Sequence, residues 1–173
     1  MKKYLGALSA GLTSILMFVF LSIPCLTLNV ANNTTTNNYS GWQILSGVNE
    51  SSSTLFSNLD SYGLLKTFTI ILLVIGCLLA VLAIIMLLQN TKIIKVKFNF
   101  NFINVLLQIL FCVSVIVIMI AMSNLNSDLG TTITQTIKTY YTIGMGTIFN
   151  LIVGVIATVL SILGMQKVKK GRK

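Results

Sequence analysis

The chain has 173 residues, of which 55% are hydrophobic and 9% are charged, and its formal net charge is +9. This composition lies outside the range of ordinary soluble domains, so we expect one compact membrane domain. The chain has no histidine and only three acidic residues, which excludes a Ser-His-Asp triad and imidazole metal ligands. We therefore expect a protein without enzymatic activity and without a cofactor.

Four uninterrupted apolar stretches predict four transmembrane helices. A helix rises about 1.5 Å per residue, so roughly 20 apolar residues cross a hydrocarbon core about 30 Å thick. Each stretch has about this length and contains no ionisable Asp, Glu, Lys, Arg or His; the stretches are residues 5–23, 67–88, 102–122 and 143–165. The sequence thus predicts an all-α membrane protein, an antiparallel four-helix transmembrane bundle with a small extracytoplasmic β-hairpin between the first two helices.

The positive charges gather on one side of this predicted bundle. Ten of the twelve cations precede the first span, lie in the loop 89–101, or follow the fourth span. The positive-inside rule places both termini in the cytoplasm and the loops 26–66 and 123–139 outside. We therefore expect a multi-pass protein of the plasma membrane. The basic tail 166–173 is suited to anionic lipid headgroups and too short to form a nucleic-acid site.

The first outer loop predicts a β-hairpin that stands on the membrane. Residues 26–30 alternate apolar and polar side chains, as a half-buried strand does. An asparagine-rich turn follows, then a second strand over residues 39–47, and then a short helix over residues 55–59. The second strand holds the only tryptophan, which is either an interfacial anchor or part of a partner contact. The candidate contact residues are Trp42, Tyr39 and Ile44.

Small and amide side chains inside the spans predict how the helices pack. Small residues let helix backbones approach closely, and the candidates are Gly76, Ala80, Gly146 and Gly154. Neutral amides in hydrocarbon seek partners, so we expect them to point inward and hydrogen-bond across helices. Alternatively, they line a polar path through an oligomer. These amides are Asn104, Gln108 and Asn150.

The segment Ser40-Gly41-Trp42-Gln43-Ile44-Leu45, which follows the first span and its strand, resembles a stretch of small four-span proteins of low-GC Gram-positive bacteria and their wall-less relatives. That resemblance implies a bacterial membrane protein and no particular activity. More distantly, the layout is similar to claudin-type tetraspan proteins, which place a tryptophan-bearing sheet in the first outer loop. The paired loop cysteines of claudins are absent here, which argues against a claudin-like junction.

Two functional classes follow from these features. The first is a non-enzymatic scaffold or accessory subunit that binds another protein, or a second copy of itself, through the outer cap or helix faces. The second is a small oligomeric channel or transporter. A scaffold buries its three amides in satisfied pairs, whereas a pore turns them toward water. The sequence favours the scaffold, because no charge marks a conduction path.

Overall fold

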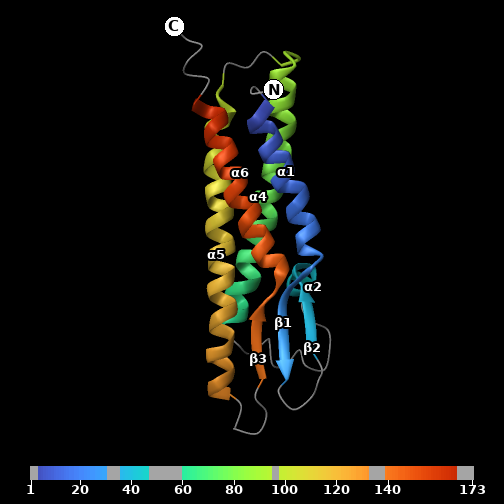
Figure 1. Cartoon of the computed structure of the whole chain (residues 1–173), viewed down its shortest axis with the longest axis vertical. Coiled ribbons are helices and arrows are strands. Elements are labelled where there is room, and N and C mark those ends of the chain that lie inside the picture. The colour runs from blue at the N-terminus through green and yellow to red at the C-terminus, as the bar shows by residue number, and fades with distance from the viewer. Residues whose placement is uncertain (1–3, 31–35, 47–59, 95–97, 133–138, 167–173) are drawn as a thin grey trace.

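The computed structural model describes residues 4–30, 36–46, 60–94, 98–132 and 139–166. Four long helices pack side by side, and a three-stranded antiparallel sheet lies at one end of them (Figure 1). Helix α1 (Leu5–Leu21) begins and helix α6 (Met145–Gln166) ends at the opposite end of the bundle. We call these two ends the sheet end and the terminal end.

The four long helices lie where the apolar stretches predict helices, but two of them are longer. Helix α4 (Asp60–Asn90) begins at Asp60 rather than residue 67, and helix α5 (Phe100–Thr132) continues to Thr132 rather than residue 122. The predicted loops at 60–66 and 123–132 are therefore wrong. Apolarity marks where a helix meets lipid, whereas the backbone of polar residues also forms helical hydrogen bonds. Leu125, fully buried, extends the core face of α5 beyond the predicted span.

Three of these helices are long and apolar enough to cross a membrane, over Ser61–Asn90, Phe100–Leu125 and Met145–Met165. Helix α1 is also apolar but has 17 residues, which is shorter than the other three. The described part of the chain is thus compatible with an integral membrane protein. Length and composition assign three spans, where the sequence predicts four.

The sheet contains the predicted hairpin and one strand more. Strand β1 (Pro24–Val30) pairs with β2 (Thr36–Ser40), and its other edge pairs with β3 (Thr139–Ile143). The strand order is β2-β1-β3, with both pairs antiparallel. The sequence predicts a loop that ends at residue 139 and a span that begins at residue 143. The structure corrects this prediction, because both residues belong to strand β3. Its threonine, tyrosine and isoleucine residues favour a strand, but the apolar stretch that follows hides this preference.

The second half of the predicted hairpin strand is a helix. Strand β2 ends at Ser40, and helix α2 (Gly41–Ser46) follows directly. The Ser40 N–H donates to Gln43 Oε1 at 2.8 Å, and the Gln43 N–H donates to Ser40 Oγ at 3.3 Å. This reciprocal pair is a capping box, which starts a helix at a Ser-x-x-Gln sequence. The strand predicted over 39–47 is therefore wrong after Ser40, and the helix predicted over 55–59 lies outside the described residues.

Around the bundle axis the helices follow the order α1, α4, α5, α6. Helix α1 packs along α4 and α6, and α5 packs along the same two helices. Therefore α1 faces α5, and α4 faces α6, across the axis. The core contains large apolar side chains, including Met17, Leu72, Leu79, Phe111 and Val115.

At the sheet end, α1 continues into β1 and β3 continues into α6 with close backbone contact. The Gly144 N–H donates to Cys25 O at 2.7 Å, and Thr147 Oγ1 donates to the same oxygen at 3.1 Å. A Cβ atom on Gly144 would overlap Pro24 O and lie 2.6 Å from Cys25 C. A side chain at position 144 would therefore push the two crossing segments apart.

Candidate functional site

Trp42 lies at the sheet end of α1, on helix α2 and not on a strand. Its ring stacks on Phe18, with ring centroids 6.0 Å apart and planes 15° apart. Its Nε1–H donates to Ser22 Oγ at 3.1 Å, and the residue is 39% exposed. Ile15 is exposed one turn before Phe18 on the same face of α1. We call Trp42, Phe18 and Ile15 the Trp42 patch.

The other two candidate contact residues lie inside the molecule. Tyr39 on β2 is 4% exposed and Ile44 on α2 is 2% exposed, and both belong to the main hydrophobic core. The Tyr62 hydroxyl donates to Ile44 O at 3.1 Å, which ties α2 to α4. Tyr39 and Ile44 thus support the cap from within. A partner contact at this cap stays a prediction. It now concerns Trp42 alone of the three candidates, because the side chains of Tyr39 and Ile44 are buried.

Asn104 joins three helices in the terminal half of the bundle. It is fully buried on α5, and its Nδ2 lies 3.0 Å from Gly6 O, 3.1 Å from Ser9 Oγ and 3.0 Å from Ser161 Oγ. Ser9 Oγ on α1 and Ser161 Oγ on α6 are themselves 2.8 Å apart. Asn104 Oδ1 has no hydrogen-bond partner among the described residues. One amide group therefore links α1, α5 and α6.

Gln108 makes a second link between α1 and α5, one turn further along. It is fully buried, and its Nε2 donates to Thr13 Oγ1 at 3.1 Å. Ser9 and Thr13 are four residues apart on α1, as Asn104 and Gln108 are on α5. Because the two helices run in the same direction, these pairs meet in register (Figure 1). Ser9 and Thr13 were not among the predicted site residues, although this shared spacing of four residues is visible in the sequence.

Asn150 is buried at the sheet end of α6, and its surroundings differ from those of Asn104 and Gln108. The residue is 2% exposed, and its Oδ1 has no hydrogen-bond partner in the part of the chain that the structure describes. Asn150 lines a small cavity together with Thr69 of α4 and Thr147 of α6. The three predicted amides thus all point inward, but they do not share one site.

The candidate packing glycines are close to neighbouring elements. A Cβ atom on Gly76 would overlap the Met17 side chain, and one on Gly154 would lie 2.9 Å from Phe111 Cδ1. On Gly146 it would lie 2.7 Å from Phe20 O. Ala80 is half-buried on α4. The glycines therefore mediate contacts within one chain.

Helix α1 exposes apolar side chains and buries polar ones. Its buried face includes Ser9, Thr13 and Ser14. Its exposed side chains between residues 8 and 19 are all apolar: Leu8, Leu12, Ile15, Phe18 and Val19. A surface helix of a soluble protein shows the opposite pattern, with its apolar face toward the core. This arrangement is stable where the surroundings of the helix are themselves apolar.

Cys25 lies in the β-bulge of β1 and is 4% exposed. Burial raises the pKa of the Cys25 thiol, against smaller lowering effects of hydrogen bonds with Thr147 and Gly41. The thiol therefore stays protonated near neutral pH, and thiolate is the reactive form of cysteine. Cys25 is a packing residue at the sheet end.

Compared with models of protein families, the chain matches none, and no curated protein matches it at a significant level.

Proposed function

We propose that the protein is a four-span integral membrane protein of the plasma membrane that acts as a non-enzymatic scaffold or accessory subunit. The observation that supports this proposal best is the burial of Asn104 and Gln108, both hydrogen-bonded to α1 within a single chain. Such amides fasten a bundle together, whereas a pore needs polar groups that face water.

The proposed fourth span is α1. Its 17 residues extend about 25 Å at 1.5 Å per residue, within the range of known spanning helices. Its exposed apolar face and buried hydroxyls suit a helix surrounded by lipid. Its packing along α4 and α6, two helices long enough to span, supports the proposal that α1 lies at the same depth.

The proposed orientation has both termini in the cytoplasm and the sheet outside. The sequence supports it by placing ten of twelve cations at the termini or in the loop 89–101. The basic tail 166–173 would then hold anionic lipid headgroups, at about 1 kcal/mol per cation near the surface. A membrane-impermeant thiol reagent applied to intact cells should label Asn37→Cys and miss Gly171→Cys. The reverse pattern would refute this orientation.

The proposed partner site is the Trp42 patch. Trp42 and Phe18 expose 39% and 36% of their surfaces where α1 meets the sheet, and Ile15 extends the patch along the apolar face of α1. Aromatic residues are enriched at the centres of protein interfaces. Because the patch continues onto a face suited to lipid, we propose a second membrane protein as partner, or another copy of this chain.

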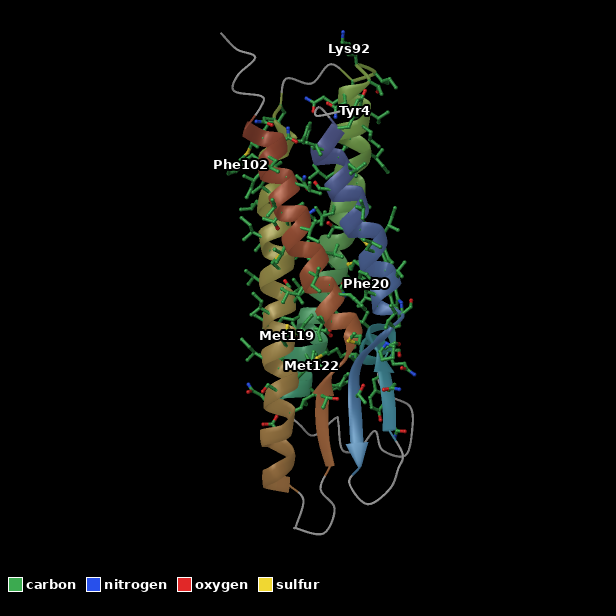
Figure 2. The ribbon with its side chains drawn as sticks, in the orientation of Figure 1. Tyr4, Phe20, Lys92, Phe102, Met119 and Met122 are labelled. Carbon is green, nitrogen blue, oxygen red and sulfur yellow. The ribbon has the colours of Figure 1, made fainter. Side chains whose placement is uncertain are left out.

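Co-purification in mild detergent tests the Trp42 patch. Trp42→Ala should lower recovery of the partner several-fold while the protein still inserts, since insertion depends on the apolar stretches. The matched control is Phe102→Ala, because Phe102 is 63% exposed on α5 and lies at the terminal end, far from the patch (Figure 2). If Trp42→Ala instead removes the protein from the membrane, Trp42 is a structural anchor and the partner site is refuted.

The alternative function, a small oligomeric channel or transporter, is tested by flux. The purified protein is reconstituted into liposomes, and ion and dye release are measured beside protein-free liposomes. The scaffold proposal expects equal release from both. If release is saturable and Asn150→Leu abolishes it, the scaffold proposal is refuted in favour of a pore that uses this amide.

A further inference from the structure

A small cavity lies on the bundle axis at the sheet end, where α1 gives way to β1. The volume open to the centre of a water molecule is about 10 Å³. Apolar side chains form most of its wall, among them Leu72, Val115 and Met122, and Figure 2 shows Met122 near the junction of helices and sheet. Thr69, Thr147 and Asn150 also line it, as does the Cys25 thiol, which donates to Ile23 O at 3.4 Å.

The polar side chains of this cavity lack a donor for Asn150. Thr69 Oγ1 already donates its hydrogen to Leu65 O at 2.8 Å, and Thr147 Oγ1 donates to Cys25 O at 3.1 Å. Each hydroxyl has one hydrogen, so neither satisfies Asn150 Oδ1, although both keep acceptor lone pairs. Asn150 is 2% exposed, which also keeps its Oδ1 from bulk solvent. A donor from outside the chain would complete the site.

We propose that this cavity binds one water molecule, which donates a hydrogen bond to Asn150 Oδ1 and a second to a threonine hydroxyl oxygen. The volume matches the ~10–15 Å³ that a single buried water needs, and two to four polar partners are typical of such waters. With Thr69 Oγ1 as the threonine acceptor, the water would join Asn150 of α6 to α4, two helices that face each other across the axis. This proposal does not depend on the proposed function.

A water suits the cavity better than a cation or an apolar ligand. The polar groups that line it among the described residues are neutral, and none of them is a carboxylate that would offset the cost of moving an ion out of water. An apolar ligand would leave Asn150 Oδ1 without a donor. Water supplies the missing hydrogen and carries no charge.

The test compares two asparagines of the full-length protein in lipid bilayers. With ¹⁵N-asparagine labelling, solid-state NMR measures magnetisation transfer from water to each side-chain Nδ2. Asn104 is the matched control, because its Oδ1 also lacks a partner among the described residues but it does not line the cavity, and its Nδ2 faces three protein oxygens. Transfer to Asn150 should build up several-fold faster than transfer to Asn104. The Asn150→Leu and Asn104→Leu variants serve only to assign the two signals.

Two outcomes would overturn the proposal. Equal build-up at Asn150 and Asn104 would mean that no water occupies the cavity. A shift of the Asn150 signal when sodium and potassium are replaced by N-methylglucamine would mean that the cavity binds a cation. An unchanged signal in both salts, together with fast build-up, supports the water.

Discussion

The terminal half of the bundle and its sheet end each bury one asparagine, but they hold their helices together differently. In the terminal half, Asn104 contacts oxygens of α1 and α6 through its Nδ2. At the sheet end, Asn150 lines a cavity, and the elements are joined by backbone contact at Gly144 and Gly146. In this protein, amide side chains link helices that run side by side. Where helix and strand meet, glycine lets two backbone segments approach closely.

The largest expected effect comes from adding one methyl group at the sheet end. In Gly144→Ala the new Cβ would overlap Pro24 O, and because backbone cannot move aside easily, we expect a loss of about 3 kcal/mol in unfolding free energy. The measurement is chemical unfolding in mild detergent. The control is Gly63→Ala in α4, where no described atom outside the local helix backbone lies within 4 Å of the new Cβ. Gly63→Ala should raise the unfolding free energy by about 0.5–1 kcal/mol, because alanine favours a helix more than glycine does.

A smaller loss is expected when the amide of the terminal half is removed. Asn104→Leu deletes the hydrogen bonds to Gly6, Ser9 and Ser161, and interhelical bonds in membrane proteins contribute about 0.6–1.7 kcal/mol. We therefore expect Asn104→Leu to lower the unfolding free energy by about 1–2 kcal/mol in the same assay. Unchanged stability would mean that apolar packing, and not this amide, holds the terminal half.

The same substitution at the sheet end should change stability less. Asn150→Leu removes one proposed hydrogen bond, from the water in the cavity, whereas Asn104→Leu removes contacts to three protein oxygens. We expect the unfolding free energy to stay within about 1 kcal/mol of the original protein. A loss as large as that of Asn104→Leu would erase the contrast between the two ends.

The smallest effect is a difference in thiol reactivity at the sheet end. Because burial raises the pKa of the Cys25 thiol, less thiolate forms at a given pH, and we expect maleimide to react slowly until the protein unfolds. Asn37→Cys provides an exposed thiol on the neighbouring strand β2 for comparison. Equal rates at the two positions in folded protein would show that the sheet end opens readily.

The sequence located the helices well because a long apolar stretch is a strong local signal. It did not locate the beginning of α4 at Asp60 or the end of α5 at Thr132, because polar residues continue a helix without an apolar signal. The helix α2 was missed although the capping box of Ser40 and Gln43 is a local sequence signal. Strand β3 was missed because its pairing with β1 depends on residues far away in the chain.

The candidate site was predictable for the amides and less so for the cap. Asn104, Gln108 and Asn150 point inward as predicted. The predicted hydrogen bonds across helices are present for Asn104 and Gln108, whereas Asn150 Oδ1 has no partner among the described residues. Their partners depend on helix order around the axis, which composition does not determine. Alternation in the cap sequence predicted a strand through Trp42, but the capping box starts a helix there and turns Ile44 into the core.

The pairing of Leu26 with Ile143 imposes an order on biogenesis. Strand β1 emerges from the ribosome soon after α1, whereas β3 is synthesised only after α4 and α5. Until then, one edge of β1 has unpaired N–H and C=O groups, which attract other strands. A nascent chain that stops before β3 therefore carries an incomplete sheet. Strand β3, which completes the sheet, directly precedes α6 in the chain.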